Sequence, residues 1–349
     1  MNWLFLVLYA LVALVYCQLS ARPTLHIFGD SLSDIGRLKS LTHGRIPPSA
    51  YWNGRFCSGP VWNEYLALLL NAQLKNYAVG VAKATTVHRS FLGVLPLDPP
   101  TTLDQITGFG LNGFVVSTMD YAILEIGSND VASALVDIVA GKQTAYEFAQ
   151  NLSTTVVGQL QMLYDIGFRR IIVFNLPALD QTPIVIQKDR SMLAHVLVFT
   201  YNRLLKEKAM EWAHKHILDR FQLVDLTQFM LAATQPNAMM ALNITNKSEY
   251  CISGSWLALF EDHLQLSSLL KFAIFANSAD KCADASSFFF FDPIHPSERV
   301  QRLFGYYMYE YICKLDAGLP PLIPSAETLL NLTTHYKLYR PVAKPVAIY

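Results

Sequence analysis

Five short runs of apolar, β-branched or aromatic residues recur along the chain, and longer segments with helical periodicity separate them. The runs are TLHIF (24–28), KNYAV (75–79), YAILEI (121–126), RIIVFNL (170–176) and FQLVDL (221–226). Between them the pattern predicts helices at about 60–72, 144–166 and 191–216. Strands that alternate with helices are typical of a parallel sheet covered on both faces, so an α/β fold is expected.

The remaining segments are interpreted as parts of one domain, followed by a tail. A closing helix is expected at 297–315, where a capped helix start follows a proline. Residues 86–116 and 228–290 have no clean period and are interpreted as loop-rich insertions. Proline then becomes frequent, so we expect a folded domain over 18–316 and an extended surface tail over 317–349.

Polar residues and a glycine stand where the first three predicted strands end. Ser31 follows the first strand in IFGDSLSDIG, Gly80 follows the second, and Asn129 follows the third in GSND. Asp292 and His295 come later, just before the closing helix. Because ligands bind at the carboxyl ends of parallel strands, these residues are candidates for one site.

The candidate residues suit nucleophilic catalysis by serine. A serine hydroxyl is a poor nucleophile unless an imidazole takes its proton and a carboxylate orients that imidazole, and His295 with Asp292 could supply both groups. The oxyanion formed on attack needs fixed hydrogen-bond donors. The Ser31 amide, an amide near Gly80 and the side-chain NH2 of Asn129 would suit that role.

Each feature also has an ordinary structural interpretation. Asp30, Ser31 and Ser33 could simply cap a helix, because Asp and Ser are preferred there. Gly80 could be a turn glycine, GSND a strand-to-helix turn, and DPIHP a loop fixed by proline. Taken singly, each feature favours the structural interpretation. Their joint occurrence in this order favours a catalytic site.

These motifs resemble those of the GDSL, or SGNH, family of esterases and lipases. Residues 29–32 reproduce its Gly-Asp-Ser-Leu block, and Gly80 follows an N-x-A segment as in its second block. Residues 127–130 match Gly-x-Asn-Asp, and residues 292–295 match Asp-x-x-His. The resemblance extends from about residue 24 to residue 312. Two further segments, 51–67 and 173–183, are similar to segments of fungal and bacterial extracellular members.

The resemblance implies a three-layer α/β/α, flavodoxin-like fold with a five-stranded parallel sheet, a shallow exposed site, and neither a metal nor another cofactor. It implies Ser31 as nucleophile, His295 as proton carrier and Asp292 as its orienting acid, with Gly80 and Asn129 binding the oxyanion. One position departs from the pattern, because the second block often reads Gly-Gly-Ala and here has Val81 in the middle. Val81 can still donate its N–H, but valine adopts a positive φ only at a cost, so either the loop geometry is ordinary there or Gly80 takes the role. Gly80 is the expected donor, and Val81 is the alternative.

The resemblance implies a secreted serine ester hydrolase that works through an acyl-serine. The substrate is expected to be a lipid or phospholipid acyl ester or an acetylated carbohydrate. An acyltransferase with the same site and a non-catalytic binding protein on the same fold are the alternatives. Tyr51 and Trp52 could contact a sugar or an acyl chain, but buried packing is favoured. FFFF at 288–291 is interpreted as a buried strand leading to Asp292.

Composition narrows the partners and the compartment. The 349 residues are 52% hydrophobic, and 27 basic residues balance 27 acidic ones, so neither disorder, nor a nucleic-acid partner, nor an obligate protein partner is expected. Residues 1–17 carry an apolar core that is short for a bilayer span but suits a signal peptide. We expect cleavage and secretion. An uncleaved membrane anchor is the alternative, because no Lys or Arg precedes the core.

Sequons and cysteines fit the secretory route. Candidate glycosylation sites are Asn151, Asn243, Asn246 and Asn331. Without Cys17, four cysteines remain, at positions 57, 251, 282 and 313, which permits two disulfides in any of three connectivities. Cys251 with Cys282 is the preferred pair, and buried free thiols are the alternative.

Overall fold

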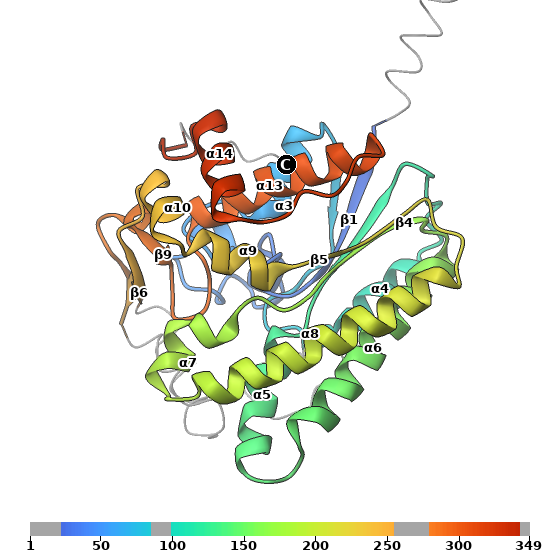
Figure 1. Ribbon diagram of the computed structural model, residues 1–349, viewed down its shortest axis with the longest axis horizontal. Coiled ribbons are helices and arrows are strands. Elements are labelled where there is room, and N and C mark those ends of the chain that lie inside the picture. The colour runs from blue at the N-terminus through green and yellow to red at the C-terminus, as the bar shows by residue number, and fades with distance from the viewer. Residues whose placement is uncertain (1–21, 85–98, 255–278, 343–349) are drawn as a thin grey trace, which may run out of the picture.

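A five-stranded parallel sheet forms the centre of the protein, as expected (Figure 1). The computed structural model describes residues 22–84, 99–254 and 279–342. The strands lie in the order β2-β1-β3-β4-β5. Their bounds are Thr24–Gly29 for β1, Gln73–Asn76 for β2, Tyr121–Glu125 for β3, Arg170–Phe174 for β4 and Arg220–Val224 for β5. All four strand pairs are parallel, so every carboxyl end opens onto the same edge.

Alternate residues of each central strand are buried in two different layers. On β1, Leu25 and Ile27 pack into one hydrophobic cluster, while Phe28 packs into the other. On β3, Ile123 and Leu124 divide in the same way. Side chains of a strand point to opposite faces in turn, so strands buried on both sides appear in the sequence as continuous apolar runs.

Helices cover both faces of the sheet and complete a three-layer α/β/α arrangement (Figure 1). On one face lie α3 (Trp62–Leu69), α9 (Leu226–Ala233) and α13 (Glu298–Asp316). The other face is covered by α4 (Thr102–Leu111), α5 (Ser128–Val139), α6 (Ala145–Ile166) and α8 (Ser191–His214). Shorter helices are α2 (Arg37–Leu41), α7 (Pro183–Gln187) and α10 (Pro236–Ala241), with 3-10 turns at Trp52–Gly54, Leu179–Gln181 and Ala285–Ser287.

The two segments predicted to be loop-rich contain more regular structure than their sequences indicate. The first includes α4, and the second includes α10, the parallel pair of β6 (Asn246–Tyr250) with β9 (Phe288–Phe290), and the antiparallel pair of β7 (Ile252–Ser253) with β8 (Asp280–Lys281). These elements of the second segment have six residues or fewer, so each offers too few positions for a period to be recognised. Residues 85–98 and 255–278 of these segments lie outside the described residues.

The phenylalanine run forms a strand as predicted, although Phe288 is half-buried and the strand ends at Phe290. Phe289, Phe290 and Phe291 are buried, and β9 leads directly into Asp292. The backbone N–H of Phe291 donates to the carbonyl of His295, which closes the turn between them.

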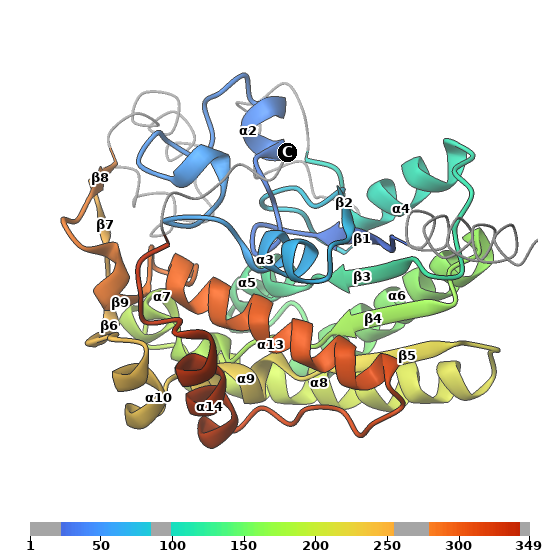
Figure 2. The ribbon, with the colours of Figure 1, turned by 90° about the horizontal axis from the view of Figure 1, so that it is seen from above.

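The prediction of an extended tail over 317–349 was wrong for residues 326–336, and residues 343–349 lie outside the described residues. Residues Ala326–Tyr336 form helix α14, which packs beside α10 and α13 (Figures 1 and 2). The Ser325 side chain caps the helix by accepting the N–H of Thr328. Leu329, Leu332 and Leu338 are buried in the core, and this apolar burial stabilises the helix. The prolines that precede the helix had favoured an extended tail in the sequence interpretation.

Candidate active site

A chain of hydrogen bonds joins Ser31, His295 and Asp292 at the carboxyl edge of the sheet. Ser31 Oγ lies 2.7 Å from His295 Nε2, and His295 Nδ1 lies 2.7 Å from Asp292 Oδ2. The serine and histidine are 264 residues apart in sequence, and all three side chains are buried. The structure therefore brings together the three residues that the sequence singled out.

The turn before α13 fixes the carboxylate of Asp292. Its Oδ1 accepts the backbone N–H groups of Ile294 and His295 at 2.9 and 2.8 Å, and its Oδ2 also accepts the hydroxyl of Tyr51 at 2.7 Å. Tyr51 is only 1% exposed, so its ring is buried as expected, but its hydroxyl contact with Asp292 was not predicted. The contact spans 241 residues, and no local sequence signal reports it.

The ring of Phe56 lies against the imidazole of His295, with their centroids 5.0 Å apart. Phe56 follows η1 (Trp52–Gly54), the same turn that presents Tyr51. An apolar neighbour on one side and a carboxylate on the other restrict rotation of the imidazole.

Ser31 does not cap the following helix. The N–H groups of Gly36, Arg37 and Leu38 all donate to the carboxylate of Asp34. Asp34 thus satisfies the start of α2, a position where unpaired N–H groups favour an acidic side chain. The Ser31 hydroxyl is left to His295, which separates the two roles that the sequence left open.

The loop after β2 differs from the expectation for Gly80. The Gly80 N–H donates to Asp34 Oδ2 at 2.7 Å, so this amide is already used inside the protein. Glycine is required here for space, because a Cβ would lie 2.4 Å from a ring carbon of Phe56. Gly80 is therefore a packing residue of the site in this structure, not a donor directed into it.

Val81 has φ of 61°, the left-handed region that β-branched residues rarely adopt. Its N–H has no acceptor among the residues that the structure describes. Local backbone strain of this kind typically costs about 1–3 kcal/mol and persists where surrounding packing imposes it. The family pattern often has glycine at this position, and glycine would adopt the same φ without this cost.

Asn129 lies at the start of α5, behind the Ser31 turn. Its Nδ2 donates to the carbonyl of Ala82 at 2.9 Å and makes a longer contact of 3.3 Å with Asp30 Oδ2. The next residue, Asp130, accepts the Ala84 N–H, and burial raises the pKa of its carboxyl to about 6. The GSND segment therefore ties the ends of β1, β2 and β3 together.

The sequence interpretation passed over a buried carboxyl group that lies close to the Ser31 turn. Glu125 ends β3, is 3% exposed, and accepts the hydroxyl of Ser33 at 2.9 Å. Its signal in the sequence is a lone acid within the apolar run YAILEI, since carboxylates are almost never fully buried without a partner. Its hydrogen-bond partner is Ser33, and burial together with the nearby charge of Glu125 raises the pKa of Asp30, which is fully buried.

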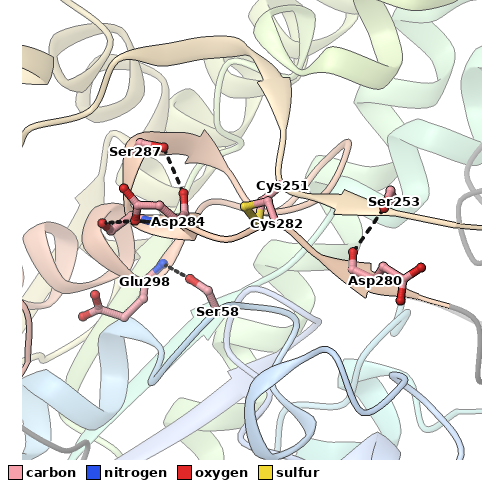
Figure 3. Close-up of a disulfide and its surroundings, with 9 residues drawn as sticks. Ser58, Cys251, Ser253, Asp280, Cys282, Asp284, Ser287 and Glu298 are labelled. Carbon is pink, nitrogen blue, oxygen red and sulfur yellow. Dashed lines mark hydrogen bonds between the residues drawn. A yellow bond between two sulfur atoms is a disulfide. The ribbon is translucent and has the colours of Figure 1, made fainter.

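A disulfide stabilises the region that carries Asp292. Cys251 and Cys282 are joined, and the segment around them lies next to the start of α13, where Ser58 accepts the N–H of Glu298 (Figure 3). The N–H groups of Cys251 and Ile252 both donate to the carbonyl of Phe291, the residue before Asp292. Cys57 and Cys313 are free thiols, so the described chain carries one disulfide where the cysteine count permitted two.

The candidate sequons lie on the surface to different degrees. Asn151, Asn243 and Asn331 are exposed. Asn246 is half-buried, and its side-chain oxygen accepts the N–H groups of Ser248 and Glu249.

In the three described stretches of the chain, no helix is long and apolar enough to cross a membrane, and no cluster of metal-ligating side chains is found. The predicted signal peptide over 1–17 lies outside them.

Comparison with known proteins assigns the chain to a family. It is 27% identical over 263 residues to a phosphatidylcholine-sterol acyltransferase of Aeromonas hydrophila, covering 72% of this chain and 73% of the relative. GDSL esterase/lipase 22 of Arabidopsis thaliana is 23% identical, over 84% of this chain and 79% of the relative. Among solved structures, the carbohydrate acetylesterase Est24 of Sinorhizobium meliloti matches with a TM-score of 0.42 and 15% identity, over 84% of this chain and all of that one. The model of the GDSL-like lipase/acylhydrolase family matches residues 25–308, and the chain belongs to this family of ester hydrolases.

Proposed function

We propose that the protein is a secreted serine hydrolase that cleaves carboxylic esters through an acyl-enzyme on Ser31. The observation that carries the proposal is the unbroken chain from Ser31 Oγ through the imidazole of His295 to Asp292, with 2.7 Å at each step. This is the geometry that lets an imidazole take the serine proton while a carboxylate holds the correct tautomer. The Cys251–Cys282 disulfide supports an oxidising compartment and hence secretion.

In the proposed reaction, Ser31 Oγ attacks the ester carbonyl while His295 Nε2 accepts its proton. His295 then returns the proton to the leaving alcohol, and a water molecule repeats the sequence to release the acid. The negative charge on the carbonyl oxygen is stabilised by the Ser31 N–H, the Val81 N–H and the Asn129 Nδ2, which gives up its longer 3.3 Å contact with Asp30 for this purpose. Val81 replaces Gly80 in this role because the Gly80 N–H is bound to Asp34.

The acyl group is proposed to come from a lipid or phospholipid ester, with an acetylated carbohydrate as the second candidate. The match to the Aeromonas acyltransferase, which covers most of both chains, supports a lipid acyl donor. It also favours acyl transfer to an alcohol as a second activity, since an acyl-serine can be attacked by an alcohol as well as by water.

A chain-length series tests the proposed function. The secreted protein is given p-nitrophenyl esters from acetyl to palmitoyl, with and without an added alcohol, and is labelled separately with a fluorophosphonate. We expect hydrolysis with a preference for the longer chains and a label on the peptide that carries Ser31. A preference for acetyl would move the substrate to carbohydrate esters. The absence of both turnover and label would reject the enzyme.

Replacing Tyr51 by phenylalanine is expected to lower kcat about tenfold with little change in KM. The Tyr51 hydroxyl donates to the same Asp292 oxygen that holds the imidazole, and a hydrogen bond to a charged group contributes about 1.5–3 kcal/mol. Steady-state kinetics on the preferred ester provide the measurement. The control is Trp52→Phe, which changes the neighbouring ring in the same turn and should keep wild-type kcat. A Tyr51→Phe variant with wild-type kcat and only a lower Tm would limit this residue to packing.

A further inference from the structure

The loop after β2 forms a tight turn at the carboxyl edge of the sheet. The Ala82 N–H donates to the carbonyl of Val79 at 3.1 Å, so these two residues bracket a β-turn with Gly80 and Val81 at its centre. Val81 has φ of 61°, whereas Gly80 does not have a positive φ. A positive φ at the third residue alone is the mark of a type II turn, and glycine normally takes that position.

The type of turn decides where the N–H of Val81, the proposed oxyanion donor, points. The peptide between the two central residues is reversed in a type II turn relative to a type I turn, so its N–H and carbonyl exchange directions. A type I turn would suit valine better, because both central φ values are then negative. In the described part of the chain the Val81 N–H has no acceptor, so the type II form leaves it available to a substrate oxygen.

A single buried carboxylate holds the centre of this turn. Asp34 is fully buried, and its Oδ2 accepts the Gly80 N–H at 2.7 Å. The same oxygen accepts the Leu38 N–H at 3.0 Å, while Oδ1 accepts the N–H groups of Gly36 and Arg37 at 2.7 and 2.6 Å. Asp34 therefore joins the start of α2 to a loop that lies 46 residues away in sequence.

Asp34 also closes the turn that carries the nucleophile. The N–H groups of Ser33 and Asp34 donate to the carbonyl of Asp30 at 3.2 and 3.0 Å, and Ser31 lies within this turn. The backbone of Asp34 thus holds the Ser31 turn, and its side chain holds the neighbouring loop. Hydrogen bonds to a charged acceptor are short and strong, so this residue can fix the two loops relative to one another.

The other contacts of the loop hold the ends of its turn. The Val79 N–H donates to the carbonyl of Gly29 at 3.1 Å, and the Ala82 carbonyl accepts Asn129 Nδ2 at 2.9 Å. Within the described chain, the hydrogen bond from Gly80 to Asp34 is the one that the two central residues make. Its loss would leave the valine free to relax to a negative φ.

We propose that Asp34 is a positioning residue, which binds the Gly80 N–H, keeps the turn in its type II form and so holds the Val81 N–H toward the oxyanion. This inference rests on the proposed ester hydrolase function. Asp34 contacts neither the substrate nor the reacting atoms, and it acts through Gly80.

The test is the kinetics of Asp34→Ser on the preferred ester. Serine can still accept an N–H at the start of α2, but it has no second oxygen, so the Gly80 N–H loses its acceptor. The turn then relaxes and one oxyanion donor is lost. We expect kcat to fall about a hundredfold with little change in KM, the scale and pattern for a donor that acts only in the transition state.

The matched control is Asp120→Ser at the opposite edge of the sheet. Asp120 is also buried, and its two oxygens accept the backbone N–H groups of Thr24 and Ser117. This variant should lower Tm and leave kcat near that of the wild type. If the two serine variants lower kcat alike, or if Asp34→Ser keeps wild-type kcat, Asp34 has only a structural role and the inference is overturned.

A second replacement, Val81→Gly, separates the turn from the rest of the fold. Glycine adopts a positive φ without the cost that valine has, so the type II turn then depends less on Asp34. The factor by which Asp34→Ser lowers kcat should shrink about tenfold when Val81→Gly is also present. An unchanged factor would contradict the inference, because damage elsewhere in the fold lowers kcat equally in both backgrounds.

Amide hydrogen exchange on the unmodified protein covers the case in which Asp34→Ser does not fold. The Gly80 amide should be protected in the free protein, and the Val81 amide should exchange rapidly. Labelling Ser31 with a fluorophosphonate, whose phosphoryl oxygen stands in for the oxyanion, should then protect Val81. Rapid exchange at Gly80, or no effect of the label on Val81, would overturn the inference. Failure of the proposed function appears differently, as the absence of both turnover and label in the wild type.

Discussion

Replacing Ser31 by alanine is expected to lower kcat for the preferred ester by about 10⁶-fold, the scale seen when the nucleophile of a serine triad is removed. The hydroxyl that His295 Nε2 meets at 2.7 Å is then missing, so no acyl-enzyme can form. Residual rate enhancement comes from substrate binding and oxyanion stabilisation alone. KM should change little, because the side chain is small and the loop around it is held by other contacts.

The measurement is hydrolysis of p-nitrophenyl esters by purified wild-type protein and variant, with burst kinetics to detect the acyl-enzyme. Ser40→Ala is the matched control, since Ser40 is an exposed serine on α2, nine residues along the chain. It should retain wild-type kcat and burst amplitude. If Ser31→Ala keeps more than about a tenth of the wild-type kcat, another residue is the nucleophile.

Replacing Asp292 by asparagine is expected to lower kcat by about 10⁴-fold while the fold is retained. Asparagine can direct its NH2 toward His295 Nδ1, which must then accept a hydrogen bond. The neutral imidazole therefore adopts the tautomer in which Nε2 carries the proton. A protonated Nε2 in the neutral ring cannot take the proton of Ser31. The hydrogen bond from Tyr51 is also weakened, because its acceptor is no longer charged.

Kinetics and thermal unfolding of the same sample separate this effect from damage to the fold. The control is Asp284→Asn, an exposed acid that caps the 3-10 turn Ala285–Ser287 ahead of β9. Its kcat should stay near that of the wild type. A loss of less than about tenfold for Asp292→Asn, with an intact Tm, would mean that Asp292 does not orient His295.

The central sheet and the serine, histidine and aspartate could be predicted because each depends on local sequence. Strands buried on both faces appear as apolar runs, and the Ser31 and His295 motifs each lie within a few residues of a strand or helix end. Tyr51 could not be identified as a partner of Asp292, since their contact depends on how η1 packs against a turn 241 residues away. Glu125 did leave a signal, an acid inside an apolar strand, which an inspection for buried charge would find.

Two other differences have different physical causes. The expectation for Gly80 followed a family pattern, but the direction of a backbone N–H depends on its acceptor, and Asp34 becomes that acceptor only in the folded loop. Helix α14 was missed because its few buried leucines are stabilised by contact with α10 and α13 and not by a long periodic pattern. In both cases tertiary contacts decide a structure that local composition leaves undetermined.

The distance in sequence between Ser31 and His295 has a consequence for biosynthesis. A ribosome makes the chain from its amino end, so β1 and Ser31 exist long before the turn at 292–295 emerges. Until then Ser31 lacks its hydrogen-bond partner His295, the base of the proposed mechanism. Under the proposed function, activity is therefore expected only after the turn at 292–295 has been made and has packed against the edge of the sheet that carries Ser31, so activity would report completed folding.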